Sequence, residues 1–154
     1  MRTVRGGYGV FTQTAIEGGA RVLEFVGELV PRAVVAREAQ ANGHDGFLQI
    51  SRDAFLGLSG GADDYVNHSC APNCFVEFDN GRMWLVALAA IAAGAELYFD
   101  YGVTQIDFPF RFNCLCRTAR CRGAIGNYDE IPPETLTVYR AQRVVPGHIE
   151  ALLD

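Results

Sequence analysis

Lysine is absent from this chain of 154 residues, in which all thirteen basic side chains are arginine. A protein that modifies lysine side chains would therefore not modify this chain itself. The formal net charge of -5 argues against a nucleic-acid partner bound through its phosphates, because such binding needs a surplus of positive charge. A basic protein or peptide suits this charge better as a partner, and we expect no direct contact with nucleic acid.

A secretion signal and long hydrophobic runs are missing as well. Arg2 and Arg5 precede a glycine turn instead of the apolar segment of a signal peptide. The uncharged run over residues 83–95 is shorter than the roughly 18 residues that a membrane span needs. We therefore expect no membrane association and a reducing intracellular location, cytoplasmic or, in a eukaryote, nuclear. In such a compartment the five cysteines favour metal binding or burial over disulfides.

The length and the 49% hydrophobic content predict one domain with a core of its own. Apolar runs bounded by turn residues predict strands over residues 8–11, 20–30, 47–51 and 54–58. The turn dipeptide Asn80-Gly81 predicts a hairpin of residues 74–78 and 83–88. Helices are expected over residues 31–42, 134–143 and 146–152, and a loop over 104–113. The similar segments 15–20 and 90–95 predict one turn type that is used twice.

Three stretches gather the side chains that carry chemistry. Residues 64–73 read Asp-Tyr-Val-Asn-His-Ser-Cys-Ala-Pro-Asn, a run without an apolar period that predicts a loop facing a ligand. Residues 96–102 read Glu-Leu-Tyr-Phe-Asp-Tyr-Gly, and further on Cys114-Leu115-Cys116 is followed by Cys121. A glycine-containing turn over residues 5–11 precedes all three.

These stretches, in this order between residues 5 and 126, resemble the SET-domain family of protein-lysine methyltransferases. Asn67-His68-Ser69-Cys70 and residues 96–101 match its two signature motifs, and the cysteine cluster looks like its post-SET segment. The resemblance implies a mainly β fold of several short curved sheets, with a pseudoknot and with short helices at the insert and the C-terminus. It divides the chain into a SET domain (1–108), a post-SET zinc-binding segment (109–127) and a C-terminal helical tail (128–154), with no pre-SET segment.

The resemblance also implies S-adenosylmethionine-dependent methylation of the side-chain amine of lysine in a protein, with a histone as one candidate. Free lysine has a pKa of about 10.4, so a narrow apolar and aromatic channel must desolvate the ammonium and favour the neutral amine. By position, the catalytic tyrosine that orients this amine is Tyr101. Phe99 lies two residues earlier on an expected strand and would face the same channel. A phenylalanine there implies di- or trimethylation.

Asn67 and His68 occupy the positions that bind the cofactor in the family. Glycine permits backbone conformations that a Cβ forbids, so the turn of Gly7, Tyr8 and Gly9 can approach the cofactor's amino-acid moiety. Tyr101 and Leu115 complete the expected cofactor-binding set.

Zinc is the expected metal. Cys114, Cys116 and Cys121 supply three thiolates, whereas a tetrahedral zinc site needs four ligands. The resemblance assigns the fourth position to Cys70, and such a site would tie the C-terminal segment over the active centre. Cys74 is left over as a buried thiol. The alternative for the whole cluster is a set of reduced structural cysteines.

Two departures from the family pattern bear on substrate choice. Asp64-Tyr65 stands where the family usually has Arg-Phe, and residues 47–49 stand where it often has Tyr-x-Phe. Two other functions are open, a non-catalytic zinc-containing peptide-binding module and a hydrolase that uses Cys70 and His68. The hydrolase is disfavoured because neighbours in one motif rarely form the spatial pair that this chemistry needs. With so short an insert, a homodimer or the C-terminal tail would complete the peptide groove.

Overall fold

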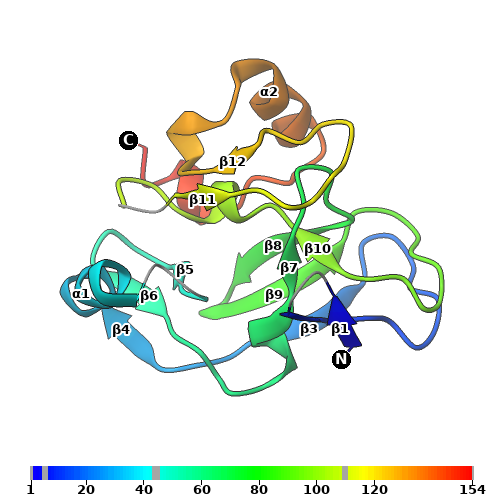
Figure 1. The fold of residues 1–154 in the computed structure, drawn as a ribbon, viewed down its shortest axis with the longest axis horizontal. Helices are drawn as coiled ribbons and strands as arrows, with labels where there is room; N and C mark the ends of the chain where they lie inside the picture. The colour runs from blue at the N-terminus through cyan, green and yellow to red at the C-terminus, as the bar shows by residue number, and fades with distance from the viewer. Residues whose placement is uncertain (1, 5–6, 43–45, 109–110, 154) are drawn as a thin grey trace.

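Small β-sheets and a few short helices make up the chain in the computed structural model, which describes residues 2–4, 7–42, 46–108 and 111–153 (Figure 1). The central sheet has the strand order β3 (Arg21–Phe25), β9 (Arg82–Ala87) and β8 (Cys74–Asp79). The expected hairpin of β8 and β9 is confirmed. Its turn places Asn80 and Gly81 at φ +49° and +76°, the left-handed conformation that a tight hairpin requires. The mainly β class predicted from the sequence is likewise confirmed.

A second sheet, beside helix α1 (Arg32–Asn42), has the order β4 (Leu29–Pro31), β6 (Ala54–Leu56) and β5 (Leu48–Gln49). The prediction of one strand over residues 20–30 was wrong, because that segment divides between the two sheets. The chain changes sheets where Gly27 passes so close to Gly57 that a Cβ on Gly27 would lie 2.1 Å from the Gly57 carbonyl oxygen.

Strands β7 (Asn67–His68) and β10 (Tyr98–Phe99) form a parallel pair between the two signature motifs. Asn67 lies opposite Tyr98, and His68 lies opposite Phe99. After β10 the chain turns at once into the 3-10 helix η2 (Tyr101–Thr104). The two motifs are thus brought side by side, while the threading of this segment as a pseudoknot stays a prediction.

The similar segments over residues 15–20 and 90–95 adopt the same turn and pair with each other. Gly19 and Gly94 have φ angles of +81° and +79°, and Ile16 and Ile91 exchange two backbone hydrogen bonds of 2.9 Å. The one turn type that the sequence indicates is confirmed, and the segments that contain its two copies are hydrogen-bonded to each other.

The shorter elements correct several predicted boundaries. The strand expected over 8–11 is β2 (Gly7–Gly9), which pairs with β1 (Arg2–Val4). The expected loop over 104–113 ends in β11 (Phe112–Asn113), which pairs with β12 (Ala124–Ile125). The 3-10 helices η1 (Ala62–Tyr65) and η3 (Tyr128–Glu130) were not predicted. The C-terminal helices are α2 (Pro133–Ala141) and α3 (Gly147–Glu150), the second shorter than expected.

The C-terminal tail packs on the turn that follows β10. Val103 and Ile106 of that region form one buried cluster with tail residues from Tyr128 to Ile149. In Figure 1 the tail, with α2 and α3, covers the side of the molecule that also carries β11 and β12. None of the helices in the described part of the chain combines the length and hydrophobicity that crossing a bilayer requires.

Candidate active site

A narrow channel lies between the central sheet, the second sheet and η2. Its volume is about 50 Å³. Most of its lining is aromatic or aliphatic: Phe25, Phe47, Leu48, Leu56, Val66, Phe99, Tyr101 and Phe112. Two carboxylates, Asp63 and Asp64, also line it, and their oxygens accept hydrogen bonds from Ser59 and from nearby backbone N–H groups. Such a channel suits a long aliphatic side chain with a positive end.

A wider cleft of about 320 Å³ adjoins the channel. Polar and apolar groups share its lining: Gly7, Asn67, His68, Glu96, Tyr98, Tyr101, Phe112, Asn113, Leu115, Cys116 and Ile125. Tyr101 and Phe112 line both spaces. Glu96 is the single charged side chain among the described residues of the lining, so the cleft favours a ligand with positive charge. Its size is that of an ordinary small-molecule site.

Asn67 is oriented by two hydrogen bonds. Its Nδ2 donates to the Tyr8 carbonyl oxygen and to Glu96 Oε1, both at 2.9 Å. Glu96 Oε2 accepts from the Tyr98 hydroxyl at 2.5 Å. The amide nitrogen has only two hydrogens, and these two bonds use both. The Asn67 side chain can therefore offer a ligand only its Oδ1, which is an acceptor. A ligand ammonium fits that acceptor better than a carboxylate does.

Of the other residues predicted to bind the cofactor, some line the cleft and others do not. Gly7 and Leu115 line it, and Leu115 is 62% exposed. Tyr8 takes part through its carbonyl oxygen, while its ring packs edge-on against Tyr65 at 5.6 Å. Gly9 is not in the lining, because it faces Glu96: a Cβ there would lie 2.4 Å from Glu96 Oε1. Residues 5 and 6 of the same turn lie outside the described residues.

Tyr101 is fixed by its backbone and by its hydroxyl. The Tyr101 N–H donates to His68 Nδ1 at 3.2 Å, and the hydroxyl donates to the Val66 carbonyl at 2.7 Å. Its ring lies 4.8 Å from that of Phe99. The strand alternation invoked for these two residues was wrong, since β10 ends at Phe99. The 3-10 turn nevertheless brings both rings to the channel.

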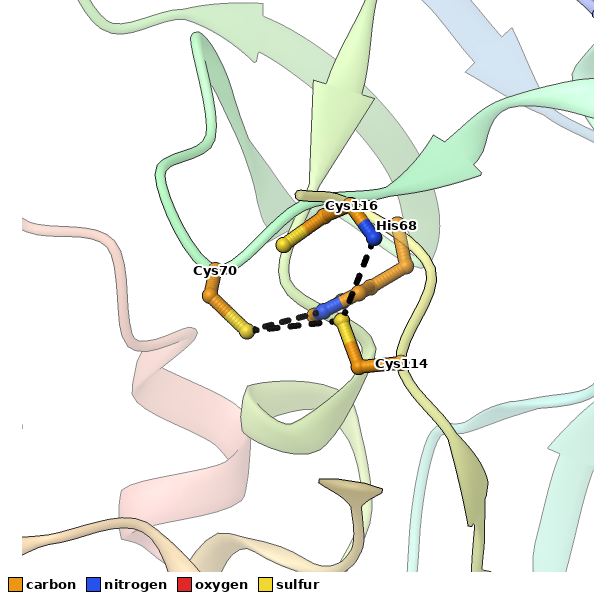
Figure 2. A group of neighbouring side chains, drawn as sticks. All are labelled: His68, Cys70, Cys114 and Cys116. Carbon is orange, nitrogen blue, oxygen red and sulfur yellow. Dashed lines mark hydrogen bonds between the residues drawn. The ribbon is translucent and has the colours of Figure 1, made fainter. Parts of the chain in front are cut away.

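Three cysteines and a histidine converge beside the cleft (Figure 2). The ligand atoms of His68, Cys70, Cys114 and Cys116 all lie within 4.8 Å of one another. Cys70 Sγ lies 3.7 Å from Cys114 Sγ, close to the roughly 3.8 Å edge of a tetrahedron with Zn–S bonds of about 2.3 Å. The donor set therefore fits zinc. Cys121, the remaining expected ligand, lies beside Cys114, whose thiol it contacts.

The thiols of the cluster differ in how readily they ionise. Burial raises the pKa of Cys70 to about 11. Burial also acts to raise the pKa of Cys116, but hydrogen bonds involving Thr118 and the neighbouring cysteines outweigh it and lower that pKa to about 6. Cys74 lies outside the cluster, is fully buried as expected, and has its pKa raised by burial to about 12.

The hydrolase alternative fails on electrostatics and access. Contrary to expectation, His68 and Cys70 do form a spatial pair, with 3.3 Å between His68 Nε2 and Cys70 Sγ. Cys70 is only 1% exposed and its pKa is raised, whereas a nucleophilic cysteine needs a lowered pKa and access to substrate. Burial lowers the pKa of His68 to about 4, so its imidazole is neutral and stabilises no thiolate by charge.

Beneath the site lies a buried carboxylate, Asp100, which is inaccessible to solvent. Arg122 binds it in a bidentate pair with N···O distances of 2.6 and 2.8 Å. The Gly102 N–H donates to it at 3.0 Å, and the Tyr139 hydroxyl lies 2.9 Å away. Arg122 and Tyr139 were not predicted from the sequence as site residues. No local pattern marks either residue, because both act on a residue that is distant in the sequence.

The profile of the SET domain matches residues 7–102. The chain is 29% identical to "Histone-lysine N-methyltransferase, H3 lysine-36 specific" of Aspergillus fumigatus, over 99% of the chain and 16% of that protein. It is 36% identical to "Histone-lysine N-methyltransferase ash1" of Drosophila melanogaster, over 80% of the chain and 6% of that protein. The chain thus spans less than a fifth of the length of these curated relatives.

The fold is also similar to that of a solved structure. A structure titled "ctPRC2 in an autoinhibited conformation bound to S-adenosylmethionine" superposes with a TM-score of 0.57 and 27% identity. The match covers 71% of this chain and 15% of that one.

Loss of Arg122 should destabilise the fold strongly. Its side chain is 12% exposed and Asp100 is 0% exposed, so Arg122→Ala leaves a buried charge without its cation. We expect the free energy of unfolding in urea to fall by about 3–5 kcal/mol. Arg111→Ala is the matched control, because Arg111 pairs with Glu130 while 66% exposed, and should cost less than about 1 kcal/mol. Equal losses in the two variants would contradict this account.

Proposed function

Because this chain belongs to the SET-domain family, we propose that it transfers a methyl group from S-adenosylmethionine to the side-chain amine of a lysine in a protein. One observation carries the proposal: Tyr101 lies at the junction of a narrow channel with aromatic walls and a wider cleft of mixed polarity, and lines both. A lysine entering the channel and a cofactor held in the cleft would meet at this residue. The relatives named as histone-lysine methyltransferases and a related structure titled as bound to S-adenosylmethionine support this assignment.

The cleft has the groups that S-adenosylmethionine needs. The cofactor supplies an electrophilic methyl group on a sulfonium, and its amino-acid end carries an ammonium. Asn67 Oδ1 suits that ammonium, and Glu96 adds a negative charge to offset the net positive charge of the ligand. We assign cofactor binding to Gly7, Tyr8, Asn67, His68, Tyr101 and Leu115. Gly9 contributes indirectly, because its missing side chain leaves room for Glu96.

The channel supports the deprotonation that transfer requires. A lysine side chain threaded between Phe25, Phe99 and Phe112 would lose water from its ammonium, and desolvation lowers the pKa of a lysine. Asp63 and Asp64 would attract the cation to the channel before this happens. Tyr101 then orients the neutral amine. The substrate class that fits is a lysine-containing basic protein, with a histone as one candidate, in keeping with the negative charge of this chain.

Zinc belongs to the proposal as a structural metal. We assign Cys70, Cys114, Cys116 and Cys121 as its ligands, and Cys121 is included because it contacts the Cys114 thiol. His68, whose Nε2 lies 3.3 Å from Cys70 Sγ, would hydrogen-bond the bound thiolate. The ion would tie residues 109–127, the proposed post-SET segment, to the first signature motif. Since Cys116 and Leu115 also line the cleft, metal loading would be coupled to cofactor binding.

The function is tested by incubating the chain with labelled S-adenosylmethionine and lysine-rich proteins, histones included. We expect the label on a lysine of the substrate. The enzyme should carry no labelled lysine, because its sequence contains no lysine. Tyr101→Phe should lower kcat by about a hundredfold while the protein stays folded, because the orienting hydroxyl is lost. Binding of S-adenosylmethionine without any transfer to these proteins would instead favour the non-catalytic module.

Metal analysis should find about one zinc per chain. Cys116→Ser should lower the zinc content and the affinity for S-adenosylmethionine together, because the segment that carries Leu115 and Cys116 would no longer be tied down. The control is Cys74→Ser, which removes a buried thiol outside the cluster and should leave the zinc content unchanged. Full activity of Cys116→Ser without metal would refute the post-SET assignment.

The number of methyl groups should depend on Phe99. It is buried in the channel lining, 4.8 Å from the Tyr101 ring and 5.6 Å from the Phe25 ring. Phenylalanine cannot hold an ordered water where a methylated amine must turn, so we expect di- or trimethylation. Phe99→Tyr should shift the product towards monomethyl-lysine and leave the first transfer largely intact, as read by the intact mass of a peptide substrate. A wild-type product that stops at monomethyl-lysine with enzyme in excess would contradict this prediction.

A further inference from the structure

Tyr139 of helix α2 reaches from the C-terminal tail to the buried Asp100 beneath the site. Its side chain belongs to the buried cluster of the tail, and the residue is 2% exposed. The hydroxyl oxygen lies 2.9 Å from Asp100 Oδ2 and 3.0 Å from the Cys70 carbonyl oxygen, both of them acceptors. A phenol has one hydrogen to donate, so the two acceptors share it. Burial and the neighbouring Asp100 charge raise the pKa of Tyr139, which keeps this hydrogen in place.

Asp100 connects Tyr139 to Tyr101, because its side chain bonds both the Tyr139 hydroxyl and the turn that carries Tyr101. It immediately precedes Tyr101, and its Oδ1 accepts from the Gly102 N–H at 3.0 Å, which caps the 3-10 helix η2. Tyr101 itself donates its N–H to His68. The peptide groups on both sides of the Tyr101 side chain are thus held by Asp100 and His68. Any freedom of the Asp100 carboxylate would be transmitted to the ring that lines both channel and cleft.

The hydroxyl of Tyr139 has a distinct part in this arrangement. Arg122 neutralises the Asp100 charge through two hydrogen bonds, so the carboxylate does not depend on Tyr139 for its counter-charge. Tyr139 restrains the Asp100 carboxylate from a third side, in addition to Gly102 and Arg122. It belongs to a helix that packs on Val103 within η2. The profile of the SET domain ends at residue 102, well before this tyrosine.

We propose that Tyr139 is a positioning residue for Tyr101, acting through Asp100, so that the C-terminal tail is part of the catalytic unit. This inference rests on the methyl transfer proposed above. The tail then does more than cover a hydrophobic surface: one hydroxyl from α2 restricts the carboxylate that caps the turn carrying Tyr101. A small displacement of an orienting group lowers the rate of transfer more than it lowers binding.

The test compares Tyr139→Phe with Tyr128→Phe in the full chain. Both variants remove a hydroxyl from the same buried cluster and keep the ring, but the Tyr128 hydroxyl accepts from Arg140 and does not contact Asp100. Loss of one hydrogen bond should lower Tm by about 2–4 °C in each. Only Tyr139→Phe should lower kcat, by about three- to tenfold, with KM for peptide and for S-adenosylmethionine within about twofold of wild type.

A second readout is independent of turnover. Deuterium exchange of the backbone amides at residues 100–104, well below Tm, should be at least about threefold faster in Tyr139→Phe than in wild type and unchanged in Tyr128→Phe. Equal losses of kcat in the two variants would overturn the proposal, since stability alone would explain them. A fall in zinc content or cofactor affinity with unchanged kcat would overturn it too, because Tyr139 would then act through Cys70.

The two proposals fail in different ways. If the wild type binds S-adenosylmethionine but methylates no lysine, the proposed function is refuted, and amide exchange alone decides the role of Tyr139. Faster exchange confined to residues 100–104 would then still support positioning of the turn, and unaltered exchange there would refute it.

Discussion

A carboxylate without access to water, that of Asp100, is the constraint on which the site depends. Burying an unpaired charge costs several kcal/mol, so the fold must bring donors to it. These donors come from separate places: the backbone of Gly102, the guanidinium of Arg122 beyond the last cysteine, and the hydroxyl of Tyr139 in α2. Satisfying one charge therefore requires the turn, the cysteine segment and the tail to be in place together.

The parallel pair of β7 and β10 shows the same dependence on its surroundings. Each strand has two residues, which is too few for a pair to be stable by itself. It is held by contacts on several sides, including the bond from the Ser69 N–H to the Phe99 carbonyl and the bond from Tyr101 to His68. The motif residues are thus fixed by tertiary packing, which lets an irregular loop present them with little freedom.

Two spaces with different linings meet at Tyr101. On one side aromatic rings surround a space with room for little more than an aliphatic chain, and on the other Asn67 and Glu96 offer acceptors to a cationic ligand. In the proposed reaction the channel would desolvate the lysine, while the cleft would bind the cofactor. The cluster of His68, Cys70, Cys114 and Cys116 borders the cleft through His68 and Cys116, so a metal there would act on the cleft more directly than on the channel.

The sequence by itself determined the class of fold, the β8–β9 hairpin and the motifs that indicate methyl transfer, because turn dipeptides and ordered short motifs are local signals. Only the tertiary structure decided which groups surround those motifs. The break at Gly27 follows from close approach to a backbone 30 residues away, and the roles of Glu96 and Tyr139 follow from hydrogen bonds between distant segments. Such contacts leave no periodicity in the sequence, since each joins single residues whose spacing is set by the whole fold.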